Sequence, residues 1–141
     1  MATTPTTSHS LSRRLLRNTL RANSIFCVLS GLLLTAGAGP IATFLGWSTP
    51  IPLIVIGIGL LLYGALLFRR VAHAAIDARA GMFYVIGDTA WVGASVILLL
   101  TNWVPFTTEG KWAIALQALI VAGFAVLQFF GVQRIMYKER P

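Results

Sequence analysis

The chain has 141 residues, of which 57% are hydrophobic and 11% are charged, and its mean hydropathy is +0.80. Soluble domains carry about 25% charged residues, so this composition excludes an ordinary soluble protein and indicates an integral membrane protein. The net charge of +7 does not indicate nucleic-acid binding, because the basic residues are separated by apolar runs and do not form one patch.

In chain order, residues 1–10 are polar and lack an apolar period, which predicts a disordered cytoplasmic tail. Residues 11–21, with leucines on one helical face and arginines on another, predict an interfacial amphipathic helix. Residues 22–134 then form a single transmembrane domain, followed by a cytoplasmic tail over 135–141. We expect membrane spans at about 23–45, 51–68, 83–104 and 112–133, each near the roughly 20 residues that a bilayer core requires. The predicted fold class is therefore an all-α membrane protein, a bundle of four transmembrane helices.

The basic residues predict the orientation of this bundle. Ten of the eleven lysines and arginines precede the first span, follow the second or follow the fourth. By the positive-inside rule, both termini and the connection between the second and third spans are cytoplasmic, and the same residues attract anionic lipids of the cytoplasmic leaflet. The ten residues are Arg13, Arg14, Arg17, Arg21, Arg69, Arg70, Arg79, Arg134, Lys138 and Arg140. A cleaved signal, suggested by Arg13-Arg14 and by Ala36-Gly37-Ala38, would leave the N-terminus outside, against this charge pattern.

Few residues in the sequence carry recognisable chemistry. Cys27 is the single cysteine, which excludes an intramolecular disulfide and a CxxC pair. His9 and His73 both lie outside the predicted spans, so haem ligation is not expected. His73 and Asp77 would share a face of a short helix ending at Gly81 in the middle loop, but further metal ligands are missing there, and a solvated surface pair is expected. We therefore expect no cofactor, no metal and no enzymatic activity.

Tryptophans flank the predicted spans on the side opposite the arginines. Trp47, Trp103 and Trp112 lie in or next to the external turns, where amphipathic rings settle at the level of the headgroups. They are predicted to be interfacial anchors.

Asp88 is the carboxylate that lies within a predicted span. A charged residue in hydrocarbon costs roughly 2.5–3.5 kcal/mol, so Asp88 needs a partner or a task. In the structural interpretation it pairs with Arg21, Arg79 or a loop amide and fixes the packing. In the functional interpretation it is a proton or cation site. Ser95 and Asn102 follow Asp88 in steps of seven and extend a polar stripe that points inward.

An ungapped shift of 65 residues aligns the first half of the chain with the second, for example Trp47 with Trp112 and Asn23 with Asp88. The alignment predicts two tandem helical hairpins related by an axis along the membrane normal. It also places four side chains at one depth, near the cytoplasmic boundary. They form a candidate polar layer of Asn23, Tyr63, Asp88 and Gln128.

The segments RANSIFCVLSG and GDTAWVGASVILL, which open the two hairpins, resemble small four-span bacterial membrane proteins of uncharacterised function. The resemblance covers about residues 20–134 and implies a multi-pass protein of the bacterial plasma (inner) membrane. Small multidrug transporters also have four short helices, but they carry a glutamate in the first span, where this chain has no carboxylate.

These features lead to two main hypotheses. The first is a scaffold, accessory or assembly subunit that acts through helix–helix contacts in the lipid bilayer, with a second copy or with a larger membrane complex. The second is a minimal transporter or channel that uses Asp88 as a proton or cation site. A third hypothesis, a receptor for anionic lipid at the arginine-rich face, predicts binding that weakens with salt.

Overall fold

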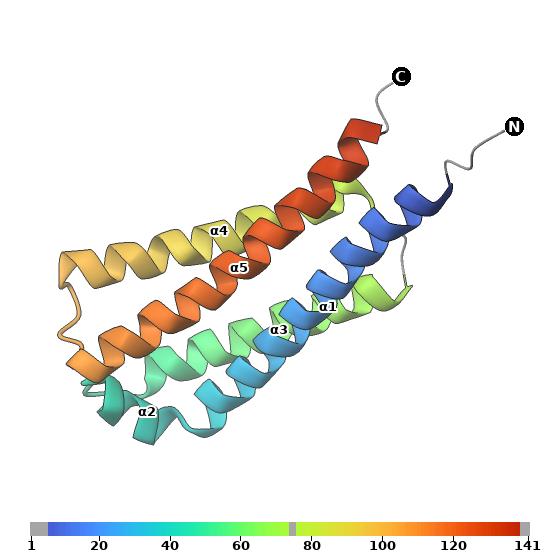
Figure 1. Cartoon of the computed structure of the whole chain (residues 1–141). Helices are drawn as coiled ribbons and strands as arrows, with labels where there is room; N and C mark the ends of the chain where they lie inside the picture. Colours follow the sequence, from blue (N-terminus) through green and yellow to red (C-terminus); the bar gives the residue numbers. More distant parts are fainter. Residues whose placement is uncertain (1–5, 74–75, 139–141) are drawn as a thin grey trace, which may run out of the picture.

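The computed structural model describes residues 6–73 and 76–138, which form five helices and, within these ranges, no strand (Figure 1). The helices are α1 (Thr6–Ala36), α2 (Ala38–Leu45), α3 (Ile51–His73), α4 (Ala78–Thr101) and α5 (Thr108–Lys138). Within the described residues, α1, α3, α4 and α5 are each long and apolar enough to cross a membrane. The predicted all-α, four-span bundle is therefore confirmed, and the protein is a multi-pass membrane protein.

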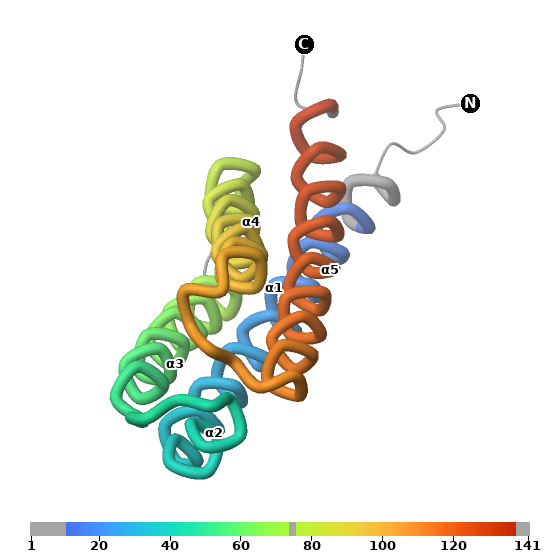
Figure 2. The backbone as a smooth tube through the Cα atoms, turned by 90° about the vertical axis from the view of Figure 1, so that its left-hand side faces the viewer, coloured from blue at the N-terminus to red at the C-terminus, as the bar shows by residue number. Residues whose placement is uncertain are grey.

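The four long helices form two hairpins. α1 packs along α3, α4 packs along α5, and α1 also packs against α5 across the bundle. Figure 2 shows the two pairs side by side, with α1 and α5 at their junction. A two-fold axis would relate α1 to α4 and α3 to α5, so the α1–α5 contact should be repeated between α4 and α3. Within the described residues, however, α3 and α4 do not pack along one another. The arrangement thus departs from the symmetry that the repeat predicts.

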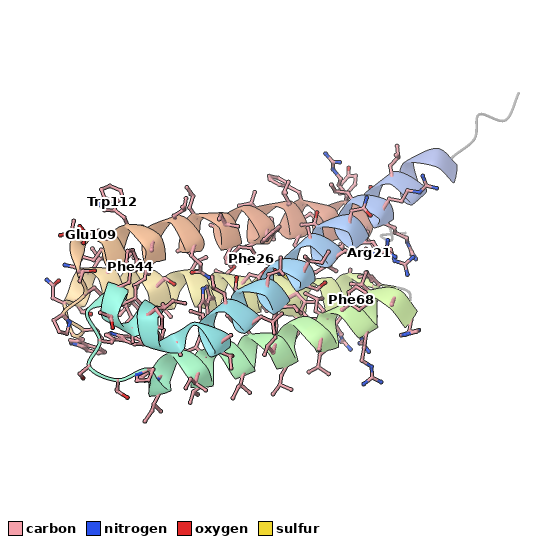
Figure 3. The ribbon with its side chains drawn as sticks, turned by 90° about the horizontal axis from the view of Figure 1, so that it is seen from below. Arg21, Phe26, Phe44, Phe68, Glu109 and Trp112 are labelled. Carbon is pink, nitrogen blue, oxygen red and sulfur yellow. The ribbon has the colours of Figure 1, made fainter. Side chains whose placement is uncertain are left out.

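Most basic residues lie at one end of the bundle, and Trp47, Trp103 and Trp112 lie at the other. The first turns of α1, the last turns of α5, the end of α3 and the start of α4 lie at one end, and α2 and the α4–α5 connection lie at the other (Figure 1). We call the first the basic end, because it carries Arg13, Arg14, Arg17, Arg21, Arg69, Arg70, Arg79 and Arg134, and the second the tryptophan end. Figure 3 shows Arg21 toward the basic end and Glu109 and Trp112 at the tryptophan end.

The N-terminal segment differs from the prediction. Residues 6–10, which we assigned to the tail, are the first turns of α1, while 1–5 and 139–141 lie outside the described residues. Residues 11–21, predicted to be a separate interfacial helix, instead continue α1 directly into the bundle. Leu16 and Leu20 are fully buried, with Leu67, Val71, Val132 and Ile135. Leu16 and Leu20 therefore meet the other helices, whereas Leu11 at the start of the segment is exposed.

The first span also ends earlier than predicted. α1 stops at Ala36, Gly37 leaves the helical conformation, and the separate helix α2 begins at Ala38. Pro40 explains the break, because in a continuous helix its ring would clash with the carbonyl of Ala36 four residues earlier. In the first turn of α2 its missing N–H costs nothing.

The connection between α3 and α4 contains no separate helix within the described residues. α3 continues to His73, and Asp77 caps α4 by accepting a hydrogen bond from the Ala80 N–H at 2.7 Å. His73 and Asp77 therefore do not share a helix face, contrary to the prediction. Arg17 of α1 secures the end of α3 by donating two hydrogen bonds, of 3.1 and 2.8 Å, to the Val71 carbonyl.

Glycines bring α1 and α3 into close backbone contact. A Cβ added at Gly31 would lie 2.7 Å from the Gly57 carbonyl oxygen, and one added at Gly64 would lie 3.0 Å from the Ser24 carbonyl oxygen. These distances leave no room for a side chain. Small residues at helix interfaces allow this approach in membranes, where packing replaces the hydrophobic effect. The two helices of the α1–α3 hairpin are therefore closely packed against each other through these glycines.

Candidate functional site

Helix α4 directs Asp88 into the bundle. The buried positions of this helix include Gly81, Val85, Asp88 and Ser95, spaced by three, four or seven residues, so they form one inward stripe. Asp88 is 4% exposed. The sequence prediction that this carboxylate points inward is therefore matched by the geometry.

Asp88 accepts hydrogen bonds from the three other membrane-spanning helices. Asn23 of α1 donates its Nδ2 to Oδ2 at 2.7 Å, and Gln128 of α5 donates its Nε2 to the same oxygen at 2.9 Å. Tyr63 of α3 donates its hydroxyl to Oδ1 at 3.4 Å. The structure thus brings together all four residues of the candidate polar layer, which we call the Asp88 cluster: Asn23, Tyr63, Asp88 and Gln128.

The donors of the Asp88 cluster are neutral. They supply hydrogen bonds to the carboxylate but no positive charge, and within the described residues no ion pair involves Asp88. The predicted pairing with Arg21 or Arg79 is therefore wrong, and both arginines are exposed. Helix geometry gives the reason, since each residue turns the helix by about 100°. Arg21 is two residues from Asn23 and Arg79 is nine residues from Asp88, so both side chains turn to the outer faces.

A cavity of about 380 Å³ lies beside the Asp88 cluster. All four spanning helices contribute to its walls, and Asp88, Asn23 and Tyr63 line it at the polar end. The remaining lining residues are mainly apolar or aromatic: Phe26, Cys27, Ser30, Ile56, Gly59, Leu60, Gly87, Trp91, Gln117 and Val121. Cavities that bind small molecules typically have volumes of about 300–1,000 Å³ and apolar walls with a few polar groups.

The aromatic rings of the cavity are held by contacts with neighbouring side chains. Phe26 packs on Phe124 with ring centroids 5.7 Å apart, and Figure 3 shows Phe26 about midway along the bundle. The Trp91 indole donates its N–H to Gln117 Oε1 at 3.1 Å. The Tyr63 ring meets Tyr84 edge-on at 5.9 Å. These contacts fix the rings before any ligand binds.

The other residues of the predicted stripe on α4 have local partners. Ser95 is buried and donates its hydroxyl to the Trp91 carbonyl at 2.9 Å, so its bond stays within α4. Asn102 does not point into the bundle: it is the left-handed cap of α4, is exposed, and accepts a hydrogen bond from Lys111 at 3.0 Å. Because α4 ends at Thr101, Asn102 lies outside the helix, and the seven-residue spacing no longer places it on the same face as Asp88 and Ser95.

The three predicted tryptophan anchors have different environments. Trp103 and Trp112 are 79% and 73% exposed at the tryptophan end, as an interfacial anchor requires. Trp47 instead packs against Phe106 at 5.7 Å, and its buried indole N–H has no hydrogen-bond partner within the described residues. Trp47 is therefore part of the packing that joins α2 to the α4–α5 connection.

Sequence reasoning missed most of the residues that line the cavity. Cys27 donates its thiol to Asn23 Oδ1 at 3.5 Å, and the spacing of four residues on one helix was a usable signal. Phe26, Gly59 and Trp91 gave no separate signal, because aromatic and glycine residues in spans are also ordinary packing residues. Gln128 has a further feature: its buried Oε1 has no hydrogen-bond partner within the described residues.

Comparison of the chain with protein-family models, with curated proteins and with solved structures finds no match. The site must therefore be judged from its own chemistry. Among the described residues, no group of three or more His, Cys, Asp or Glu side chains could hold a metal ion. The remaining chemistry is that of a single carboxylate, bound by neutral donors, at the polar end of an apolar cavity.

Proposed function

We propose that this protein is a small multi-pass membrane transporter that binds a proton or another cation at Asp88. The observation that carries the proposal is a buried carboxylate with neutral partners beside a cavity of about 380 Å³. A buried charge without an opposite charge is costly, and intramembrane carboxylates with this environment commonly mark ion pathways. A cation that reaches Asp88 through the cavity would supply the missing charge.

The position of the cluster along the bundle also supports transport. Arg21 is two residues from Asn23, while Arg69 and Arg134 are each six residues from Tyr63 and Gln128, so the Asp88 cluster lies about 3–9 Å of helix rise from the nearest arginines of the basic end. In the other direction the cavity extends from Tyr63 to Ile56, seven residues or about 10 Å along α3. Asp88 therefore lies between a nearby polar boundary and a cavity that continues toward the middle of the bundle.

The scaffold hypothesis stays a prediction and is the main competitor. It accounts for the close α1–α3 packing and for a hydrogen-bonded cluster that links four helices, but it does not require a cavity beside the carboxylate. Under either hypothesis we infer from the charge distribution that the basic end is cytoplasmic. The bacterial plasma membrane, anionic cytoplasmic lipids and self-association or a larger membrane complex remain part of the proposal, and it assigns no catalytic step to the chain.

Flux in proteoliposomes tests the proposal. The purified chain is reconstituted with a pH-sensitive dye inside the vesicles, a potassium diffusion potential is imposed, and proton entry is recorded for the parent, Asp88→Asn and Glu109→Gln. Glu109 is the matched control, because it is an exposed carboxylate at the tryptophan end. Thermal unfolding in detergent is measured for each variant, so that loss of flux can be separated from loss of the fold.

We expect proton entry in the parent and in Glu109→Gln, and entry at the level of empty vesicles in Asp88→Asn that remains folded. A parent that moves no protons while Asp88→Asn lowers the unfolding temperature would support the scaffold and overturn proton transport. Proton entry that persists in folded Asp88→Asn would overturn the role of Asp88.

A further inference from the structure

The cavity corresponds to a difference between the two halves of the chain. In the 65-residue alignment, Phe26 corresponds to Trp91 and Gly59 corresponds to Phe124. Phe26 and Phe124 pack ring against ring where α1 meets α5. Among the described residues Trp91 makes no ring contact with α3, where position 59 is glycine and a Cβ would meet no heavy atom within 4 Å. Gly59 lines the cavity, so the cavity includes the place where the second half of the chain has a ring.

This space opens between two spanning helices. Gly59 of α3 and Gly87 of α4 both line the cavity and are both exposed, so they mark its mouth. Within the described residues α3 and α4 do not pack along one another, and Tyr63 bridges them at the Asp88 cluster through its contacts with Tyr84 and Asp88. Both glycines lie well inside the candidate spans Ile51–His73 and Ala78–Thr101. The mouth therefore faces the hydrocarbon of the bilayer and not water.

From this geometry we infer that the cavity binds an amphipathic organic cation, which enters from the bilayer between α3 and α4. The charged nitrogen lies at Asp88, and the apolar part of the ligand occupies the space beside Gly59. The inference rests on the proposed function, because it names the class of cation that the transporter would take.

The walls of the cavity favour an organic cation over an inorganic ion. Phe26, Tyr63 and Trp91 bring three aromatic rings from three helices to the cavity that Asp88 lines, and the faces of such rings attract alkylammonium groups. A hard inorganic cation needs about six oxygen ligands. Asn23 and Tyr63 turn their donor groups toward Asp88, and Gln117 Oε1 is already bonded to Trp91, so these side chains offer few free oxygens.

The access route favours an amphipathic ligand over a strongly hydrated one. A ligand that reaches Asp88 through hydrocarbon must partition into the bilayer, and a volume of about 380 Å³ admits a small aromatic or branched body. The carboxylate rejects anions, and a neutral ligand of the same shape would leave the charge of Asp88 uncompensated.

Binding of a matched pair of probes tests the inference. The probes are 3-phenylpropyltrimethylammonium and its uncharged analogue, in which carbon replaces the nitrogen. Calorimetric titration uses the full chain in lipid nanodiscs, with Asp88→Asn, Gly59→Phe and Gly93→Phe as variants. Gly93→Phe is the control, because Gly93 is exposed, an added Cβ there meets nothing within 4 Å, and it does not line the cavity.

We expect the ammonium probe to bind the parent at least about tenfold more tightly than the neutral analogue. Gly59→Phe should lose this binding because the new ring fills the cavity, and Asp88→Asn should lose the preference for charge, while Gly93→Phe behaves as the parent. Size-exclusion profiles confirm that each variant is folded. Equal binding of both probes, or parent-like binding by Gly59→Phe, overturns the inference.

The test separates the inference from the proposed function. Absence of ammonium binding together with Asp88-dependent proton flux overturns the inference and leaves the transporter proposal intact. Asp88-dependent ammonium binding without flux of protons or of the probe supports the inference and overturns transport.

Discussion

The α1–α3 and α4–α5 hairpins occupy corresponding halves of the chain but pack differently. In the first hairpin, glycines at 31, 57 and 64 bring two backbones into contact. At the corresponding positions, 65 residues later, the second hairpin has Val96, Ala122 and Phe129. At these positions the first hairpin thus makes close backbone contact, which the larger residues of the second hairpin do not repeat. The two hairpins thus share a helical framework but differ in the residues at their interfaces, and Gly59, which corresponds to Phe124, is one of the residues that line the cavity.

The two hairpins also differ in the polar residues at corresponding positions of the Asp88 cluster. Asn23 corresponds to Asp88 and Tyr63 corresponds to Gln128, and all four meet in one cluster. The hydrogen bond between Asn23 and Asp88 joins two corresponding positions, 65 residues apart. One half thus contributes a neutral donor and the other half a carboxylate. Because only one half of the chain has a carboxylate at this position, the cluster has one charge and no repulsion between like charges.

A carboxylate in both halves of the chain should produce the largest loss of stability. Asn23→Asp replaces a donor by a second carboxylate whose oxygen would lie about 2.7 Å from Asp88. Because two like charges then share a buried site, we expect the free energy of unfolding to fall by about 3–5 kcal/mol. Chemical unfolding in one detergent measures the change.

Moving the charge is the matched control for this variant. The double variant Asn23→Asp with Asp88→Asn restores one carboxylate and one amide, now exchanged between the hairpins. We expect it to recover at least half of the lost stability, as coupled neighbours do in a double-mutant cycle. A double variant no more stable than Asn23→Asp alone would show that the cluster depends on more than its total charge.

Removing a strong donor should have a smaller effect than adding a second carboxylate. Gln128→Leu deletes the 2.9 Å hydrogen bond to Asp88, and hydrogen bonds to charged groups contribute about 1.5–3 kcal/mol. The substitution also removes the buried Gln128 Oε1, which has no partner within the described residues, so the loss should lie at the lower end of that range. Denaturant titration checks this value, and Gln133→Leu, at an exposed position on the same helix, is the control.

Glycine packing gives a third test, within one helix. Gly57→Ala forces a methyl group onto the Gly31 carbonyl oxygen and the Thr35 side chain, so we expect a loss of about 1–3 kcal/mol. Gly59→Ala, two residues later, meets open space and should be neutral or stabilising by up to about 1 kcal/mol, because alanine is the better helix former. Equal effects of the two substitutions in thermal unfolding would contradict close backbone packing as the basis of the first hairpin.

The sequence was sufficient for the parts of the structure that follow periodic rules. Span number, the inward direction of Asp88 and the meeting of Asn23, Tyr63 and Gln128 all follow from helical periods and from the 65-residue alignment. The expected arginine partners were wrong because proximity in sequence was used without the 100° turn per residue. The break after Ala36 required weighing Pro40 against the carbonyl four residues earlier.

The cavity could not be predicted, because it depends on how the hairpins sit against each other. Gly59 in a span usually indicates close packing, as Gly57 does, and nothing in the local sequence distinguishes the two glycines. The distinction appears once α3 is seen to contact α1 through Gly57 and to face the cavity through Gly59. Periodicity determines which face of a helix is polar, but the distance between two hairpins depends on all of their side chains together.

The smallest expected effect concerns the weakest member of the cluster. Tyr63 donates to Asp88 at 3.4 Å, longer than the bonds from Asn23 and Gln128, so Tyr63→Phe should lower the free energy of unfolding by about 0.5 kcal/mol. The ring stays, and with it the edge contact to Tyr84. If Asp88 binds a cation, the loss of one donor leaves the carboxylate less satisfied before binding, and the ammonium probe should bind Tyr63→Phe slightly more tightly than the parent. Weaker binding with unchanged stability would instead assign the hydroxyl to the ligand, since a hydroxyl that holds only the packing would not change the affinity for the cation.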